Sequence, residues 1–308
     1  MAKRPAPSKE NDALPQALVV ASRGRQCLIE TPAGQRIACQ MRGRKMDATV
    51  GDAVRWRAVA DGGVIERVEP RRSLLYRQDE VRARRFAANI SQVLIVLAAE
   101  PAPSLEQTAR ALIACEAAHI PALIALNKAD LAAPFAHALA RLAPYRAAGY
   151  AVLPLCAVGE HAADTAPKAA LLPLLRGHTT LLLGPSGAGK STLINRLIPG
   201  AAAQTGAISQ ALQSGRHTTT ATTLYWLDAE KASALIDSPG FQQFGLRHIE
   251  AAQLAACMPD IAARTGGCRF YNCTHRTEPG CCVTAAVQGG ALDEHRWKLY
   301  SQFYDECL

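Results

Sequence analysis

The residues with the clearest chemical signal form one glycine-rich segment, Gly184-Pro185-Ser186-Gly187-Ala188-Gly189-Lys190-Ser191. An apolar run at residues 180–183 precedes it and a helix-like stretch at 193–197 follows, which is the context of a phosphate-binding loop. Its glycines let backbone N–H groups surround a polyphosphate at the N-terminus of the helix. We therefore expect nucleotide contacts from Gly184 through Thr192, with Lys190 on the β- and γ-phosphates and Ser191 on Mg²⁺.

A second segment, Asn127-Lys128-Ala129-Asp130, follows the predicted strand at residues 122–126. Open parallel sheets bind ligands at the carboxyl ends of their strands. The Asp130 carboxylate can accept hydrogen bonds from N1–H and the exocyclic amine of guanine, groups that adenine does not present. Asn127 would brace the loop and Lys128 would lie along the base, so the expected nucleotide is GTP or GDP.

Two further strand ends complete the predicted nucleotide site. Cys156-Ala157 follows the strand at residues 151–155 and would contact guanine O6 through backbone N–H groups. In Asp237-Ser238-Pro239-Gly240, the Asp237 carboxylate would hold the water shell of Mg²⁺ and the Gly240 N–H would contact the γ-phosphate. Thr218 or Thr219 would supply a hydroxyl to the same ion, and the sequence does not choose between them. Lys190 and Asp237 are thus the candidate catalytic residues of the phosphate end.

Three cysteines and one histidine near the C-terminus have the chemistry of zinc ligands. Cys268, Cys273, His275 and Cys281 supply three thiolates and an imidazole, a set suited to a closed tetrahedral site. Four protein ligands leave no position for a substrate, so the ion would be structural. The spacing is not that of the common zinc ribbon, and a small core of reduced cysteines is the alternative. Cys282 is an adjacent spare thiol.

The net charge of +8 is concentrated in the first 90 residues, which hold 18 Lys or Arg against 10 Asp or Glu, whereas the rest hold 16 of each. This asymmetry favours an anionic partner for the N-terminal part, although a solvated basic surface has the same composition. Residues 1–15 are typical of a disordered basic tail rather than a signal peptide. No apolar run approaches the roughly 18 residues of a membrane span, so we expect a cytoplasmic protein without a membrane partner.

Five short runs of alternating polarity between residues 16 and 70 predict a small β-barrel of the oligonucleotide-binding (OB) type at residues 16–72. Five basic side chains would form its RNA-binding face: Arg42, Arg44, Lys45, Arg55 and Arg57. Barrels of this size also bind proteins or act as spacers, so the composition leaves these roles open.

The middle of the chain alternates apolar runs with helical stretches, which predicts an α/β domain at residues 86–245 with a mainly parallel sheet and helices on both faces. A charged connector at residues 73–85 would lead into it. The expected helices cover residues 104–118, where Ser104 and Gln107 form a capping box, 135–148, and 165–172, which Pro173 would end. Residues 209–221 are expected to be mobile, and residues 246–308 to form a helical zinc-binding domain.

The order of the nucleotide-binding motifs points to a family. Asn127–Asp130 precedes the phosphate loop and Asp237–Gly240 follows it, whereas most GTPases begin with the phosphate loop. Together with the basic barrel, the segment Gly215-Arg216-His217-Thr218-Thr219-Thr220 and the Cys/His cluster, the chain closely resembles the ribosome small-subunit-dependent GTPase A family (RsgA, also called YjeQ), which is circularly permuted. The resemblance covers about residues 16–305. Cys156 stands where that family commonly has serine, and Ala188 where it often has valine.

This resemblance implies a multidomain GTPase that acts late in assembly of the bacterial 30S subunit, binds 16S rRNA and is stimulated by that particle. It implies GTP or GDP with Mg²⁺, one structural Zn²⁺, and a monomer that meets the 30S subunit and other small-subunit assembly factors. By the same resemblance His217 is the candidate that positions the hydrolytic water, because Phe241 replaces the glutamine that many GTPases carry there. Gln242 and Gln243 are further options, and a purely structural His217 is the alternative.

Two other classes of function also fit the sequence. A P-loop kinase or ATPase would share the phosphate loop, but Asp130 argues for guanine. An RNA-binding adaptor with a structural nucleotide would need no hydrolytic residues, yet Lys190, Ser191 and Asp237 are all present.

Overall fold

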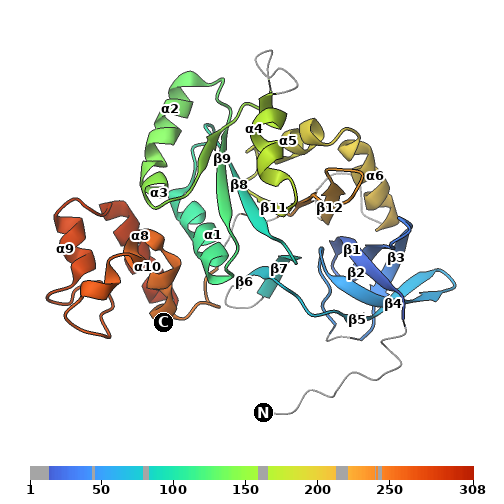
Figure 1. Cartoon of the computed structure of the whole chain (residues 1–308), viewed down its shortest axis with the longest axis horizontal. Coiled ribbons are helices and arrows are strands. Elements are labelled where there is room, and N and C mark those ends of the chain that lie inside the picture. The colour runs from blue at the N-terminus through green and yellow to red at the C-terminus, as the bar shows by residue number, and fades with distance from the viewer. Residues whose placement is uncertain are drawn as a thin grey trace, which may run out of the picture.

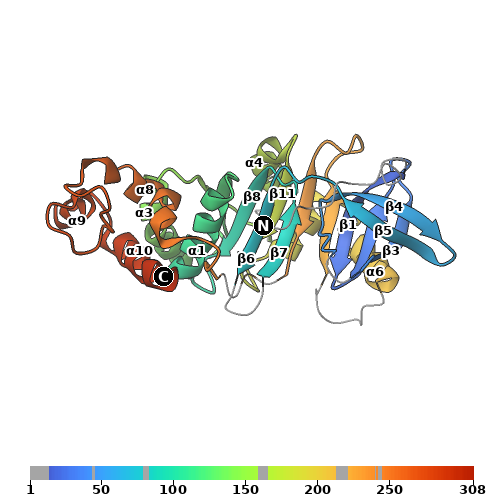
Figure 2. The same ribbon diagram turned by 90° about the horizontal axis from the view of Figure 1, so that it is seen from below.

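The computed structural model describes residues 14–43, 46–78, 83–158, 166–212, 221–239, 241 and 245–308. Three parts lie in a row along the long axis of the molecule: a β-barrel at one end, an α/β domain in the middle and a helical domain at the other end (Figure 1, Figure 2). Within the described ranges, no helix combines the length and the apolar character needed to cross a membrane.

The N-terminal part is a closed five-stranded barrel. Its strands are β1 (Gln16–Arg23), β2 (Gln26–Glu30), β3 (Arg36–Met41), β4 (Ala53–Val59) and β5 (Gly62–Val68). They pair in the order β1-β2-β3-β5-β4, and β4 returns to β1, so the barrel has no open edge. Side chains that alternate along each strand fill the interior, among them Val19, Ile29, Val54 and Ile65, all fully buried. The predicted OB-type barrel is confirmed.

The central domain is built on a mainly parallel sheet in the order β10-β9-β8-β11-β13-β12, with only β12 antiparallel to its neighbour. Its strands are β8 (Gln92–Ala98), β9 (Ala122–Asn127), β10 (Val152–Pro154), β11 (Thr179–Leu183), β12 (Thr222–Trp226) and β13 (Ala234–Asp237). Every residue of β8 is buried, as expected of a strand covered on both faces.

Helices cover the two faces of this sheet, as predicted. Val93 and Ile95 of β8 join one hydrophobic cluster with α1 (Leu105–Ala117), while Leu94 and Val96 join a second with α4 (Ala166–Leu175) and α5 (Lys190–Leu197). Successive residues of a strand point to opposite faces, so this alternation separates the two clusters. Ser104 caps α1, because its hydroxyl oxygen accepts a hydrogen bond from the Gln107 N–H.

Several elements differ from the sequence-based prediction. The helix expected at residues 135–148 is two helices, α2 (Ala132–Arg141) and α3 (Ala143–Ala147), interrupted at Leu142. The helix expected to end before Pro173 continues to Leu175, because fully buried Leu171 and Leu175 hold it on the sheet and proline removes only one N–H donor. Helix α6 (Ala201–Ala211) takes in the first residues of the segment expected to be mobile.

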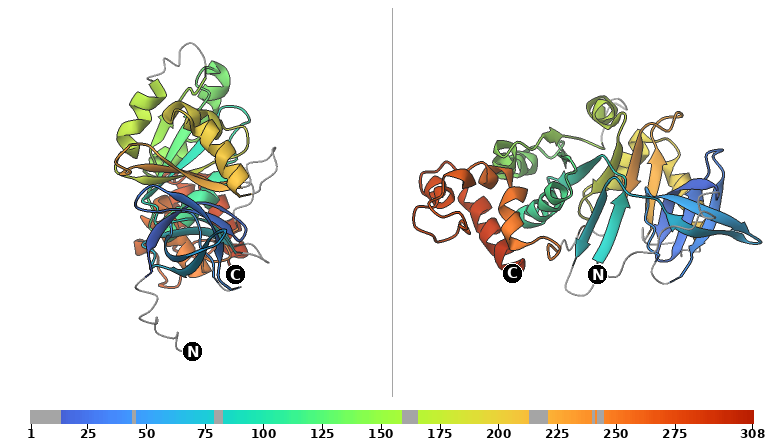
Figure 3. Two further views of the ribbon diagram at one scale, coloured as in Figure 1. Left: turned by 90° about the vertical axis from the view of Figure 1, so that its right-hand side faces the viewer. Right: turned by 60° about the horizontal axis from the view of Figure 1, so that its bottom comes forward.

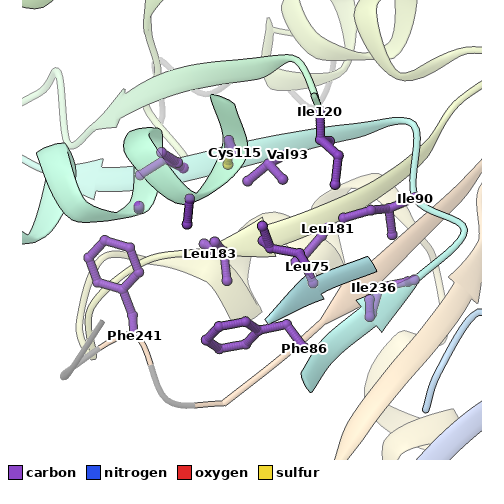
Figure 4. Packing of buried hydrophobic residues seen from close by; sticks show 14 of the residues in the cluster. Leu75, Phe86, Ile90, Val93, Cys115, Ile120, Leu181, Leu183, Ile236 and Phe241 are labelled. Carbon is purple, nitrogen blue, oxygen red and sulfur yellow. The ribbon is translucent and has the colours of Figure 1, made fainter. Parts of the chain in front are cut away.

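The connector expected at residues 73–85 contributes regular structure. Strands β6 (Leu74–Gln78) and β7 (Ala83–Ala88) pair as a separate antiparallel sheet that packs beside α1. Leu75 and Phe86 of this hairpin enter the core together with Val93, Leu181 and Ile236 of the central sheet (Figure 4). The hairpin is therefore part of the hydrophobic core of the central domain rather than a simple tether.

Barrel and central sheet are continuous. Strand β1 pairs with β12 through Ala21 opposite Thr223 and Ser22 opposite Thr222. This pairing joins the strands of the barrel and those of the central domain into one 11-stranded sheet. Across the same junction, the nearly buried Glu30 carboxylate accepts hydrogen bonds from Lys231 (2.6 Å) and Trp226 (2.9 Å).

The C-terminal part consists of short helices around one longer helix, and it docks on the side of the central domain away from the barrel (Figure 3). Its elements are α7 (Ala251–Leu254), η2 (Ala255–Cys257), α8 (Pro259–Ala262), η3 (Thr265–Gly267), α9 (Cys282–Gln288) and α10 (Glu294–Glu306). Arg296 is 2% exposed and forms a two-pronged ion pair with Asp260 at 2.8 Å, and its guanidinium lies 4.7 Å from the Tyr145 ring centroid of α3.

Candidate nucleotide site and metal centre

The phosphate loop connects β11 to α5 and requires glycine at two close approaches. A Cβ on Gly184 would lie 2.1 Å from the Val96 carbonyl oxygen, and one on Gly189 would lie 2.3 Å from the Asn127 Nδ2 atom. Both glycines also have positive φ, +155° and +95°, where other residues are strained. Lys190 begins α5, and its Nζ donates hydrogen bonds to the Gly184 (2.6 Å) and Pro185 (3.0 Å) carbonyls. A tight backbone cradle with an ammonium group at a helix N-terminus suits a polyphosphate.

Asn127, at the end of β9, ties three of the four predicted nucleotide-binding segments together. Its Nδ2 donates to the Ala188 carbonyl of the phosphate loop at 2.9 Å, and its Oδ1 accepts from the Ala157 N–H at 3.0 Å. The side chain is only 4% exposed. One amide therefore links segments that are 61 and 30 residues distant in sequence.

The guanine-side residues gather around this bridge. Lys128 has a positive φ of 68°, and its Nζ donates to the Glu100 carbonyl. Asp130 is exposed, and the Cys156 thiol lies 3.3 Å from its Oδ1 atom and 2.7 Å from the Val158 carbonyl oxygen. The Ala157 N–H donates to Asn127 and is therefore engaged. Of the two backbone groups predicted to contact guanine O6, this leaves the Cys156 N–H.

Asp237 ends β13, beside the strand that leads into the phosphate loop, and is 7% exposed. Burial raises the pKa of its carboxyl group, and attraction to Lys190 partly offsets this rise. Burial in turn lowers the pKa of Lys190, with Asp237 opposing the shift. In this buried site, the charged forms of Asp237 and Lys190 both cost free energy unless further opposite charges lie nearby. A magnesium triphosphate supplies both signs of charge, so the donor set and its burial fit that ligand.

Several predicted residues lie outside the described part of the chain. These are Gly240, His217, Thr218, Thr219, Gln242, Gln243, Arg44 and Lys45. Phe241 is described: it is 3% exposed and points into the core near Leu183 (Figure 4). Residue 241 therefore cannot orient a water molecule, and another group must do so.

The four predicted zinc ligands converge. Their ligand atoms all lie within 4.8 Å of one another. Cys268 Sγ is 4.0 Å from Cys281 Sγ and 3.4 Å from His275 Nδ1, and Cys281 Sγ is 3.8 Å from the same nitrogen. Ordinary zinc bond lengths in a tetrahedron give edges of about 3.5–3.8 Å, so these residues fit a zinc ion. Cys282 lies outside this group of four.

Side chains that the sequence pattern did not single out hold the zinc loop in shape. The Glu278 carboxylate accepts hydrogen bonds from the Thr274 N–H (2.7 Å) and the Arg276 N–H (3.1 Å). Trp297 Nε1–H donates to the His275 carbonyl at 2.9 Å, which helps hold His275 at its positive φ of 62°. The sequence offered one signal for Glu278, namely its position between two of the predicted ligands. A carboxylate at that position faces either the loop, where it can accept backbone hydrogen bonds, or the solvent.

The basic residues of the barrel are partly neutralised. Arg42 and Arg57 both pair with Glu66, at 2.5 and 3.1 Å, and Arg55 pairs with Glu69 at 2.6 Å. The hydrogen bond from Arg42 lowers the pKa of Glu66. Arg42 and Arg57 remain 67% and 59% exposed, so two guanidinium groups share one carboxylate at the surface.

The fold and site define a class of protein. A guanine-type loop, then a phosphate loop, then a strand-end aspartate follow one another on a parallel sheet, so the central domain is a circularly permuted GTPase core. It carries a barrel at its N-terminal side and a Cys/His-bearing helical domain at its C-terminal side.

Comparison with known proteins specifies the family. The family described as RsgA GTPase matches residues 68–247. The small ribosomal subunit biogenesis GTPase RsgA of Variovorax paradoxus (strain S110) is 56% identical over 297 residues, covering 95% of this chain and 92% of that protein. The protein of the same name from Ralstonia nicotianae is 47% identical over 94% of this chain and 91% of its own length. This chain therefore belongs to the RsgA GTPase family and is a GTP hydrolase.

Solved structures agree with the architecture. The crystal structure of YloQ, described as a circularly permuted GTPase, superimposes with a TM-score of 0.67 at 24% identity and covers 98% of both chains. The structure of YjeQ from Thermotoga maritima gives a TM-score of 0.70 at 26% identity, covering 95% of this chain and 98% of that one.

Proposed function

We propose that this protein binds the 30S ribosomal subunit and its 16S rRNA, acts in late maturation of that subunit, and hydrolyses GTP to GDP and phosphate faster when bound to it. The observation that carries the proposal is a GTPase site bridged by Asn127 in a chain 56% identical to a small ribosomal subunit biogenesis GTPase. Domain limits of 16–72, 86–245 and 246–308, a cytoplasmic location and a monomeric state that also meets other assembly factors are part of the same proposal.

The geometry of the site supports the nucleotide roles in this proposal. Backbone N–H groups between Gly184 and Thr192, other than at Pro185, which has none, would surround the phosphates, Lys190 would neutralise them, and Asp130 would bind the guanine edge. Ser191, Asp237 and one of Thr218 and Thr219 would hold Mg²⁺, which supplies charge neutralisation at the phosphates. Asn127 keeps the base-binding and phosphate-binding loops at a fixed separation.

The hydrolytic water needs a partner other than residue 241, because Phe241 is buried. We propose His217, whose neutral imidazole can accept a hydrogen bond from water near neutral pH. Replacing His217 by Ala should abolish the stimulated rate while GTP still binds. A parent-level stimulated rate in that variant would transfer the role to Gln242 or Gln243.

The metal centre is proposed to be structural. Cys268, Cys273, His275 and Cys281 would hold Zn²⁺ with no position for a substrate, and the ion would fix the loop between the first two ligands. On the barrel, Arg42 and Arg57 with their shared carboxylate are proposed to contact rRNA phosphates.

GTP hydrolysis with and without isolated 30S subunits tests the proposal, with 50S subunits as the control. We expect stimulation by 30S only, its loss in Lys190→Ala, and no change in the control variant Lys298→Ala, which removes an exposed lysine paired with Glu294 on α10. Equal rates with and without 30S would refute the ribosomal role. Tighter binding of ATP than GTP would instead favour a kinase or ATPase.

A further inference from the structure

The barrel meets the central sheet beside the phosphate end of the nucleotide site. Ala21 of β1 lies opposite Thr223 of β12, and Ser22 lies opposite Thr222. On its other side β12 pairs with β13, where Thr223 lies opposite Asp237. Ala21, Thr223 and Asp237 therefore form one row across three hydrogen-bonded strands, which runs from the barrel to the aspartate at the phosphate end (Figure 1).

Strand β12 is held on the barrel at both of its ends. Its first two residues pair with β1, and its last residue, Trp226, donates a hydrogen bond from Nε1–H to the Glu30 carboxylate of β2 at 2.9 Å. Lys231, which follows β12 in the chain, donates to the same carboxylate at 2.6 Å. Because a five-residue strand fixed at both ends has little freedom of its own, a displacement of the barrel displaces β12 as well.

Strand β1 also pairs with a strand that carries part of the proposed RNA contact. Gln16 lies opposite Arg55 and Leu18 lies opposite Ala53 of β4, the strand that includes Arg57. A phosphate bound at Arg57 therefore acts on a strand that is hydrogen-bonded to β1, and β1 is hydrogen-bonded in turn to β12.

Two buried hydroxyl groups continue this connection into the segment that begins with Asp237. Thr222 Oγ1 and Ser238 Oγ lie 3.3 Å apart, and the two residues are 8% and 3% exposed. Ser238 directly follows Asp237 in the chain. Hydrogen bonds between oxygen atoms usually measure about 2.7–2.8 Å, so this one is stretched. A small movement of β12 towards Ser238 would strengthen it and restrain the neighbouring Asp237.

We propose that Thr222 is a positioning residue for GTP hydrolysis, through which the barrel controls the placement of the Asp237 carboxylate. RNA bound to the barrel shifts β1 and with it β12, the hydrogen bond between Thr222 and Ser238 shortens, and Asp237 is restrained at the phosphate end of the site. The 30S subunit then accelerates hydrolysis without placing a group of its own at the nucleotide. The inference rests on the proposed function, because it explains the stimulation assigned there.

The test measures kcat and KM for GTP at saturating 30S subunits, together with the affinity for 30S subunits in the presence of a non-hydrolysable GTP analogue. Thr222→Val keeps the branched shape of the side chain and removes its hydroxyl. Its stimulated kcat should fall about tenfold, the order expected for one hydrogen bond that acts in the transition state. KM for GTP and the affinity for 30S subunits should stay at the parent values. Thr222→Ser, which keeps the hydroxyl, should restore kcat.

Two further variants control for a general effect on the fold. Thr180→Val is matched, because Thr180 is also a buried strand residue whose hydroxyl bonds a side chain, accepting from Gln92 Nε2 at 2.8 Å, and it should keep the parent kcat. Ser238→Ala removes the other partner and should lower kcat as Thr222→Val does. The double variant should lose no more than either single variant, because all three remove the same bond. Ser238→Ala also decides the question if Thr222→Val does not fold.

A parent-like stimulated kcat in folded Thr222→Val would overturn the inference and would mean that the 30S subunit acts on the nucleotide directly. An equal loss in Thr180→Val would overturn it too, because any buried strand threonine would then have the same effect. A lower affinity for 30S subunits that accounts for the whole loss would have the same consequence. A parent protein that 30S subunits do not accelerate would refute the proposed function and this inference with it. The two failures are distinguishable, because only the first shows a stimulated parent protein.

Discussion

Asn127 allows a direct test of how the nucleotide site is held together. Its replacement by Ala leaves the Ala188 carbonyl and the Ala157 N–H without their partner. A buried polar group left without a hydrogen bond costs about 1–3 kcal/mol, so the loss of stability should be about 2–6 kcal/mol. Since both groups belong to loops that we propose hold the nucleotide, GTP affinity should also fall at least about tenfold, equivalent to about 1.4 kcal/mol.

Urea unfolding and GTP titration measure the two effects, and a second asparagine provides a matched control. Asn89 also bridges two backbone groups, accepting from the Arg72 N–H and donating to the Gly51 carbonyl, both at 2.8 Å, and neither group belongs to a predicted nucleotide-binding loop. In Asn127→Asp and Asn89→Asp, a carboxylate oxygen replaces the side-chain NH₂ group. This oxygen faces the backbone carbonyl to which the NH₂ group donated. Both should be destabilised, and only Asn127→Asp should lose GTP affinity. Parent-like GTP affinity in both Asn127 variants would refute the bridging role.

Three further predictions concern the base, the metal and the domain contact. Asp130→Asn should shift preference from GTP towards XTP, because an amide can donate to the exocyclic oxygen of xanthine; a competition assay in which GTP still wins would exclude Asp130 from base recognition. A chelator should release one zinc per chain and unfold the C-terminal domain, and Cys273→Ser should hold less zinc; a chelated protein with unchanged circular dichroism and melting would contradict this. Hydrogen bonds from Arg110 lower the pKa of Glu306 below its ordinary 4.5, so its stabilising effect is present above about that pH and lost below it. The difference in melting temperature between the parent and Glu306→Gln should therefore shrink as pH falls through the acid range, and a pH-independent difference would show that the ion pair does not contribute.

The barrel shows why charge counts alone did not define an RNA-binding face. The sequence contains the arginines but does not reveal that Glu66 lies between Arg42 and Arg57. Arg57 lies on β4, Glu66 on β5 and Arg42 directly after β3, and the pairing of β5 with both of these strands brings the three side chains within ion-pair distance. The available positive charge is therefore smaller than the composition indicates, and RNA binding by the barrel should be more modest than the charge predicts.

Much of the fold was predictable because its signals are local. Alternating polarity defined the barrel strands, continuous apolar runs defined the buried parallel strands, and Ser104 with Gln107 marked the start of α1. Helix ends were less predictable: Pro173 was expected to stop α4, but contacts of Leu171 and Leu175 with the sheet outweigh one lost hydrogen bond. The hairpin β6–β7 was missed because its charged residues conceal the few that enter the core.

The sequence by itself determined which chemical groups the protein has and their order: a phosphate loop between a guanine-type loop and a strand-end aspartate, and a set of three cysteines and one histidine suited to zinc. The tertiary structure decided which groups meet. It placed Asn127 between two loops, buried Phe241, joined β1 to β12, and brought Thr222 beside Ser238. These outcomes depend on atoms within about 3–4 Å that come from distant parts of the chain, and neither local periodicity nor residue spacing contains that information.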